Sequence, residues 1–453
     1  MMAIPRLALA VPVSGPEPSP ASLGLLAGLT ERGWRVQHFR ARACPTGTEV
    51  VGQITGSPGR HLDAWLMPPD VCRTVFAQGA RDADLALVEG TLEDPELVRP
   101  LDCRENSRPG HVGPIARALD LPTVALVLCP RWDGLHLPTL PRGVDAVLID
   151  QLEVAEDYPR IANAIRVLCK VPVVGAVEAL PALRVALAAI PRDQLVPDDL
   201  IAALARSFLR FADLDKLGAL ARSRPFPGEN PAPVRPGKSK FRVAYAQDEA
   251  FGGYFPDTLE TLAALGAELV EFSPLRSEAL PENADLVMIG CGFPDRHADA
   301  LASNYSLMTS IRAHFYQGRR IYSEGGGTAY LGRSFRLGDR EVTGVGILPV
   351  DAVLLDNPLP PYPVTVTLQC DTWLGPKGAE VRGYNAGRWE LRSTSELCHC
   401  AAGFGPIAEG HDLFYHHHAV GSLVHLHFAA LPQVVAAFTG PHWPSLTRRQ
   451  ANR

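Results

Sequence analysis

The chain has 453 residues, of which 46% are apolar and 20% are charged, with a formal net charge of -6. This length predicts two or three domains, and the mildly acidic balance excludes the basic surface that nucleic-acid binding requires. No run of about 18 apolar residues occurs, so the sequence predicts no membrane-spanning helix. The nine cysteines are dispersed without the spacing of a disulfide framework, which predicts reduced thiols and a cytoplasmic location.

The first half of the chain alternates short apolar segments with amphipathic ones. The segments expected to form strands are Arg6–Val13, Arg35–Arg40, Leu85–Glu89, Thr123–Leu128, Ala146–Asp150 and Val171–Val174. Helical patterns lie between them, for example at Ser22–Arg32 and Ile161–Leu168. Strands and helices that alternate at this pitch predict a parallel sheet covered by helices on both faces.

A proline-rich segment separates this half from a second alternating region. Residues 223–240 read SRPFPGENPAPVRPGKSK, a composition that cannot build a core and predicts a stiff, extended linker. The sequence therefore predicts one domain at 1–222 and another at 241–453. The strands expected early in the second domain are Arg242–Tyr245, Glu268–Phe272, Leu286–Ile289 and Arg320–Ser323, and the part after Val342 is expected to be richer in strands.

The turn after the first strand has the frame of a phosphate-binding loop but not its chemistry. A strand, a tight turn and a helix near Ser22 follow one another, as at many phosphate sites. Such a loop needs successive backbone N–H donors and a lysine. Residues 14–20 read SGPEPSP, with three prolines that lack an N–H, a glutamate and no lysine. The residues by themselves predict an ordinary proline-rich turn.

Several ordered motifs carry a family resemblance that spans roughly residues 5–440. In chain order they are RVQHFR at 35–40, TGSPGRHLDAW at 55–65, VEG at 88–90, GCGFPD at 290–295, YSEGGGTAYL at 322–331 and SLVHLHF at 422–428. In these motifs the chain resembles the cobyrinate a,c-diamide synthases, which amidate tetrapyrrole carboxylates, as a degenerate member. The resemblance implies an α/β fold: an N-terminal P-loop-NTPase-like domain of the dethiobiotin-synthetase type and a C-terminal class I glutamine amidotransferase-like domain.

The resemblance implies an ATP and magnesium site in the N-terminal domain, and the chain departs from it at several positions. The matching positions are Ser14, Gly15, Ser19 and Glu89. The family's loop lysine corresponds to Pro18, and the family's magnesium acid in a GPDYID segment has no counterpart in residues 42–47. An asparagine–arginine pair near the nucleotide base is replaced at residues 150–151. ATP and magnesium are therefore expected by resemblance only, and no metal site is assigned.

The resemblance also places a glutaminase triad in the C-terminal domain. Gly325 occupies the position of the cysteine nucleophile, and His425 matches the triad base. Glycine suits the sharp strand-to-helix turn on which the nucleophile sits, so the turn can survive while the thioester chemistry cannot. Cys291 lies in the neighbouring loop, where we expect a small buried side chain rather than a substitute nucleophile.

Four further positions are expected to face the substrate because they match family motifs. They are Asp63, Asp248, Glu249 and Arg382. Arg382 opens a segment, RGYNAG, in which both histidines and the acid of the family's RGHEFH motif are missing.

Eight of the fourteen histidines lie between His399 and His442, with His416, His417 and His418 consecutive. Imidazole is a good metal ligand, but the spacing fits no standard zinc pattern, so the stretch is interpreted as part of a strand-rich tail. An axial histidine for a metallated tetrapyrrole is the alternative. Two tryptophans, Trp373 and Trp389, are expected in the core.

Three functional hypotheses follow from the resemblance and its departures. The first is a non-catalytic paralogue, or pseudoenzyme, of cobalamin or sirohaem metabolism that binds a tetrapyrrole or a catalytic partner. The second is an active tetrapyrrole-amidating ligase that takes ammonia from elsewhere, which the missing loop lysine disfavours. The third is a structural or regulatory subunit without a small ligand. Each of them implies assembly with itself or with a partner protein.

Overall fold

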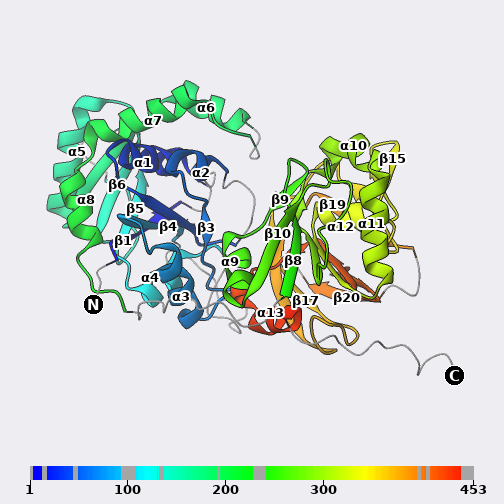
Figure 1. The fold of residues 1–453 in the computed structure, drawn as a ribbon. Helices are drawn as coiled ribbons and strands as arrows, with labels where there is room; N and C mark the ends of the chain where they lie inside the picture. Colours follow the sequence, from blue (N-terminus) through cyan, green and yellow to red (C-terminus); the bar gives the residue numbers. More distant parts are fainter. Residues whose placement is uncertain are drawn as a thin grey trace. The chain divides into compact units, whose positions relative to one another are not determined.

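The computed structural model describes residues 4–12, 18–43, 49–92, 109–129, 131, 137–190, 194–227, 241–394, 399–404 and 409–439. The chain divides into two compact units, Met1–Ala232 and Pro233–Arg453, which are called the N-terminal and C-terminal units below (Figure 1). Most of the proline-rich segment at 223–240 lies outside the described residues. Within the described residues, no helix has the length and apolarity that crossing a membrane would require.

The N-terminal unit contains a seven-stranded parallel sheet in the order β3-β2-β4-β1-β5-β6-β7. Its strands are β1 (Arg6–Val11), β2 (Val36–Arg40), β3 (Arg60–His61), β4 (Leu85–Thr91), β5 (Thr123–Leu128), β6 (Ala146–Leu152) and β7 (Val173–Glu178). The parallel sheet predicted from the alternating pattern is confirmed. The short strand β3 was missed, because two residues show no period.

Helices cover both faces of this sheet, with α1 and α7 on one face and α3 and α4 on the other (Figure 1). The helices are α1 (Pro20–Glu31), α2 (Glu49–Thr55), α3 (Pro69–Gly79), α4 (Val112–Leu119), α5 (Tyr158–Ala164), α6 (Pro181–Ala189), α7 (Asp198–Phe211) and α8 (Leu214–Ala221), with a 3-10 turn at Ala155–Asp157 and a π-helical turn at Ile165–Cys169. The close approach of α1 and α7 needs Gly28, since a Cβ there would lie 2.6 Å from Phe208 Cδ1.

The C-terminal unit is built on a ten-stranded mixed sheet in the order β10-β8-β11-β13-β22-β21-β20-β17-β18-β23. Its strands are β8 (Phe241–Ala246), β10 (Ala267–Phe272), β11 (Leu286–Ile289), β13 (Arg320–Glu324), β17 (Tyr362–Thr367), β18 (Glu380–Asn385), β20 (His399–Phe404), β21 (Glu409–His416), β22 (Ala419–Ser422) and β23 (Val424–His425). The strands from β10 to β22 in this order pair in parallel, and the rest pair antiparallel. The strand-rich end predicted after Val342 is confirmed.

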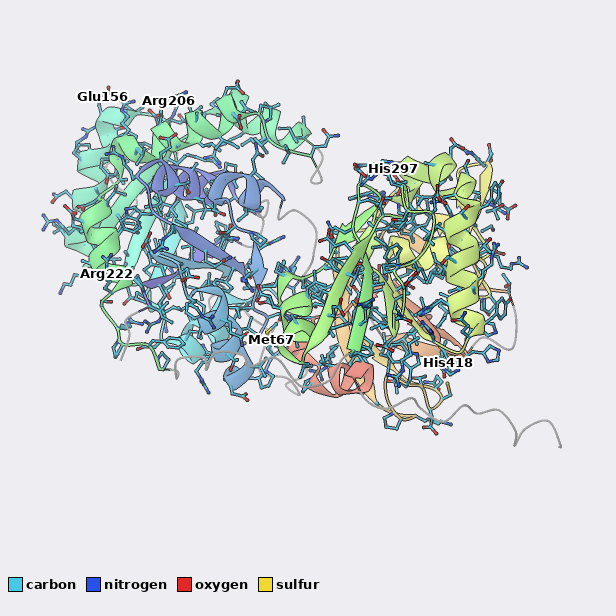
Figure 2. The ribbon with its side chains drawn as sticks, in the orientation of Figure 1. Met67, Glu156, Arg206, Arg222, His297 and His418 are labelled. Atoms are coloured by element: carbon cyan, nitrogen blue, oxygen red, sulfur yellow. The ribbon has the colours of Figure 1, made fainter. Side chains whose placement is uncertain are left out.

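Smaller elements complete the C-terminal unit. They are the strand pair β9 (Phe251–Gly253) and β12 (Cys291–Gly292), the four-stranded sheet of β14 (Ser334–Leu337), β15 (Arg340–Thr343), β16 (Val350–Leu354) and β19 (Trp389–Ser393), the helices α9 (Pro256–Ala264), α10 (Ala298–Ser303), α11 (Tyr305–Tyr316), α12 (Gly326–Leu331) and α13 (Pro432–Thr439), and 3-10 turns at Pro294–His297 and Phe428–Ala430. His297 and His418, labelled in Figure 2, both belong to this unit. The parallel strands β11 and β13 end beside β12 and α12, and this edge carries the candidate site described next.

Candidate functional site

A sharp turn at Gly325 joins the end of β13 to the first residue of α12. Gly325 has φ +53° and ψ −121°, a conformation that side chains rarely adopt and that glycine takes without steric cost. The turn is fixed on both sides, because the Gly325 N–H donates to the Ser422 carbonyl (2.8 Å) and the Thr328 N–H donates to the Gly325 carbonyl (3.0 Å). This strand–turn–helix geometry is that of a nucleophile elbow, and the residue at its apex has no side chain.

The space in front of the elbow is occupied by two other side chains. A Cβ built on Gly325 would lie 2.8 Å from His425 Cε1 and 3.2 Å from Cys291 Sγ. A side chain at position 325 would therefore point directly at the imidazole of His425. In this chain the imidazole and the Cys291 thiol lie within contact distance of that position.

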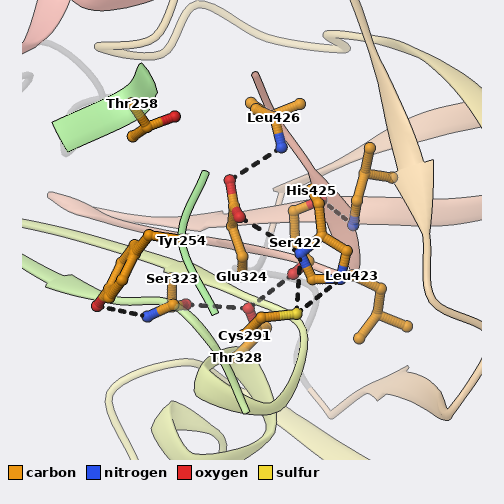
Figure 3. Close-up of polar contacts among 12 residues, drawn as sticks. Tyr254, Thr258, Cys291, Ser323, Glu324, Thr328, Ser422, Leu423, His425 and Leu426 are labelled. Atoms are coloured by element: carbon orange, nitrogen blue, oxygen red, sulfur yellow. Dashed lines mark hydrogen bonds and ion pairs between the residues drawn. The ribbon is translucent and has the colours of Figure 1, made fainter. Parts of the chain in front are cut away.

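His425 is fully buried on β23 and is held by an acidic neighbour of the elbow. Its Nδ1 lies 3.3 Å from Glu324 Oε2. Glu324 Oε1 accepts a hydrogen bond from Tyr322 Oη (2.5 Å). The same oxygen accepts a second from the Leu426 N–H (3.0 Å), as Figure 3 shows. Glu324 has no role predicted from the sequence, although its place immediately before Gly325 is a usable signal.

Cys291 contacts the same imidazole from the side of β12. Its Sγ lies 3.0 Å from Nε2 and 3.2 Å from Nδ1 of His425 (Figure 3). Burial acts to lower the pKa of His425, but the Cys291 thiol and the Glu324 carboxylate outweigh burial and hold the pKa well above its usual range. The expectation that Cys291 is only a small buried side chain is corrected here. The side chain is half-buried, and the pairing of β12 with β9 carries it to the elbow.

In the N-terminal unit, a buried network surrounds Glu89 near the end of β4. Glu89 Oε1 accepts hydrogen bonds from Ser22 Oγ (2.6 Å) and from the Ser19 N–H (3.2 Å), and Oε2 lies 2.9 Å from His38 Nε2. Burial acts to raise the pKa of Glu89, but the contacts with His38 and Ser22 outweigh it and lower the pKa. Ser19 caps α1, since its Oγ accepts from the Ser22 N–H (3.1 Å).

The comparisons with known proteins agree with this arrangement. Residues 242–432 match the model of the CobB/CobQ-like glutamine amidotransferase domain. Over 401 residues the chain is 30% identical to a cobyrinate a,c-diamide synthase of Listeria monocytogenes serotype 4b (strain F2365), covering 84% of this chain and 86% of the relative. The chain belongs to the cobyrinate a,c-diamide synthase family. Synthases of the same name from Salmonella typhimurium (32% identity over 332 residues, 70% of this chain and 71% of the relative) and Dehalococcoides mccartyi (27% over 465 residues, 96% and 98%) are also similar to it.

A solved structure titled as a glutamine amidotransferase is similar to 44% of this chain and to all of its own chain, at 16% identity and a TM-score of 0.35. The class I amidotransferase-like fold predicted for the C-terminal domain is confirmed, because the family model covers the unit that contains the elbow.

The described residues do not fit the ATP–magnesium site that the family implies. Both oxygens of Glu89 contact protein donors, so the carboxylate is engaged within the protein rather than directed toward a phosphate or a cation. No group of three potential metal ligands comes together among the residues that the structure describes. Asp150 is paired with Arg184 instead of facing a nucleotide base. Ser14 and Gly15, assigned to the same site, lie outside the described residues.

Of the four residues expected to face the substrate, two hold their own loops. Asp63 is fully buried and accepts hydrogen bonds from the backbone N–H groups of Ala43 (3.1 Å) and Trp65 (2.9 Å). Asp248 accepts four hydrogen bonds from neighbouring loops, whose donors are the N–H groups of Ala250, Phe251 and Leu275 and the hydroxyl of Ser273. The structure thus gives both carboxylates an architectural role.

The other two are placed differently. Glu249 is exposed and forms an ion pair with Arg276 (2.6 Å). Arg382 lies on β18, next to Gly383, where a Cβ would approach the His425 carbonyl oxygen to 2.2 Å. The arginine–glycine pair that survives from the family motif therefore sits where β18 packs against the strand that carries His425. A substrate contact by Glu249 or Arg382 stays a prediction.

The consecutive histidines are packed rather than gathered around a metal in the described part of the chain. His416 Nδ1 lies 2.8 Å from the Ile347 carbonyl oxygen, and its ring lies 4.5 Å from that of His417. Trp373 and Trp389 are both buried, as expected for core residues.

Proposed function

We propose that this chain is a cytoplasmic paralogue of cobyrinate a,c-diamide synthase that binds a tetrapyrrole carboxylate, or a catalytic partner protein, without an ATP-driven amidation of its own. The observation that carries the proposal is the network around Glu89. His38 and Ser22 bind the carboxylate of Glu89, the one remaining acid at the position that the family resemblance associates with magnesium. Phosphoryl transfer depends on positive charge and N–H donors around the phosphates, and SGPEPSP at 14–20 supplies neither a lysine nor an unbroken run of N–H groups.

The elbow at Gly325 also supports the proposal that the chain does not carry out the amidation reaction of its family. Gly325 offers no thiol at the position where glutamine would be attacked, so the elbow residue itself cannot form a thioester. On the basis of the family relationship, the chain would bind a tetrapyrrole or a catalytic subunit. It would form a homo-oligomer or a complex with that subunit. Arginine side chains bind carboxylates well, and tetrapyrroles of this class carry many carboxylates. Arg382 is the candidate residue for such a contact.

A binding titration tests the proposal. Calorimetry and absorbance would follow the purified full chain with ATP–magnesium and, separately, with cobyrinate, hydrogenobyrinate and sirohaem. We expect binding of one tetrapyrrole without binding of ATP, and a weaker affinity in Arg382→Ala. Arg392→Ala is the matched control, since Arg392 is exposed on β19 and pairs with Glu390. Binding of ATP–magnesium, or ATP-dependent amidation by the purified chain, would overturn the proposal and favour an active ligase that takes ammonia from elsewhere.

A further inference from the structure

We infer that Cys291 on β12 is the nucleophile of this site and takes the place of the cysteine that the elbow lacks at Gly325. With His425 as its base, it hydrolyses the γ-carboxamide of glutamine. This inference goes beyond the proposed function, which requires only binding. It rests on three side chains that converge from separate elements: the thiol of Cys291 on β12, the imidazole of His425 on β23 and the carboxylate of Glu324 at the end of β13.

The position of the sulfur is the first argument. Cys291 Sγ lies 3.2 Å from the place where the Cβ of residue 325 would be. A cysteine at 325 would carry its own sulfur one bond length beyond that Cβ, in a direction set by its χ1 angle. The two sulfur positions are therefore close neighbours in front of the same imidazole. A substrate carbonyl that approached the elbow would meet the Cys291 thiol there.

The surroundings of the thiol are the second argument. A thiol becomes nucleophilic when an adjacent base takes its proton and the resulting imidazolium is stabilised. Nε2 of His425 lies 3.0 Å from Sγ, and Glu324 Oε2 lies 3.3 Å from Nδ1. Sγ also lies 3.2 Å from Nδ1, so the thiol must turn toward Nε2 to give the order nucleophile, base and orienting carboxylate of a catalytic triad. Tyr322 and the Leu426 N–H fix the carboxylate, so the imidazole has a defined orientation.

Accessibility is the third argument. Cys72 and Cys129 are buried, and burial raises the pKa of both thiols, that of Cys72 to about 12. Cys291 is only half-buried and lies against His425, whose pKa is raised. Among these thiols, Cys291 thus combines access for a small molecule with a partner that is stabilised as a cation once it has taken the thiol proton.

The reaction that this geometry performs balances with glutamine and water as the only reactants. His425 takes the proton of the Cys291 thiol, and the thiolate attacks the γ-carbonyl carbon, forming a carbon–sulfur bond. The carbon–nitrogen bond then breaks, and ammonia leaves with the proton that His425 returns. Water attacks the γ-glutamyl thioester, loses a proton to His425, and the carbon–sulfur bond breaks. Glutamate leaves, and the thiol regains the proton from His425.

The test uses the purified full chain and 6-diazo-5-oxo-L-norleucine, a glutamine analogue that alkylates nucleophilic cysteines at glutamine sites. Peptide mass spectrometry would locate the label. We expect label on Cys291, protection by glutamine, and at least tenfold slower labelling in His425→Asn. Cys370→Ala is the matched control, because Cys370 is another half-buried thiol of the same unit, and it should leave the labelling of Cys291 unchanged.

A second variant pair keeps the inference falsifiable if single changes alter the fold. Cys291→Gly should abolish both labelling and glutamate release, and the double variant Cys291→Gly/Gly325→Cys should restore both, with the label on residue 325. Glutamine-protected label on any other cysteine of the unchanged chain, or no label at all, would overturn the inference, as would glutamate release that survives Cys291→Gly. None of these readouts involves a tetrapyrrole or ATP, so their failure is distinct from a failure of the proposed function.

Discussion

Replacing Gly325 by alanine should show how tightly His425 and Cys291 pack against the elbow, measured as a loss of stability. The methyl group has two costs. The backbone at φ +53° and ψ −121° is strained for any residue with a Cβ, which costs about 1–3 kcal/mol. The same Cβ would lie 2.8 Å from His425 Cε1, so the buried imidazole or the adjacent thiol must shift, at about 1–3 kcal/mol for an overpacked core. The expected destabilisation is therefore about 2–6 kcal/mol.

The matched control is Gly338→Ala. Gly338 has φ +60°, and a Cβ there would have no heavy atom within 4 Å, so this variant carries the cost of a positive φ without the crowding. Native-state hydrogen exchange of the full chain, read on peptides from residues 320–331 for the elbow and 334–343 for the control, gives the opening free energy of each segment. An equal loss in both variants would refute the conclusion that His425 and Cys291 fill the space in front of the elbow. Adding Cys291→Gly to Gly325→Ala should recover part of the loss.

The remaining predictions concern the carboxylates. Glu89→Gln should destabilise the N-terminal unit by about 1.5–3 kcal/mol, the value of hydrogen bonds to a buried charged group, whereas Asp84→Asn at an exposed ion pair should have almost no effect in the same urea titration. Because the folded-state pKa of Glu89 is lowered, its contribution is present above the unfolded value of about 4.3 and is lost as the pH falls below it; acid unfolding of Glu89→Gln should lack this component. Asp248→Ala removes four hydrogen bonds and should cost about 2–6 kcal/mol, against little change for the exposed Asp299→Ala, measured by urea unfolding. Tyr322→Phe removes one hydrogen-bond donor to the Glu324 carboxylate and should slow the alkylation of the Cys291 thiol by iodoacetamide several-fold. An unchanged rate would argue against a positioning role for Tyr322.

The local features of this protein follow from sequence patterns of short range. Alternating apolar and amphipathic segments predict the parallel sheet of the N-terminal unit, because the spacing of apolar residues in strands and helices can be recognised within a short stretch of sequence. The elbow at Gly325 is predicted by its motif for the same reason, since a strand, a glycine turn and a helix follow within ten residues. The motif positions also predict His425 as the base of the site.

The tertiary structure alone decides which side chains meet. Cys291 and Glu324 both contact His425 although they lie 134 and 101 residues from it in the chain. That meeting depends on the register of β12 with β9 and on β18 and β23 packing at Gly383, and neither pairing leaves a periodic signal in the sequence. Likewise His38 and Glu89 lie on the paired strands β2 and β4, and only this pairing makes a histidine the partner of the carboxylate. Contacts between distant segments are set by packing of the whole unit, so the chemistry of this site could not be inferred from its motifs alone.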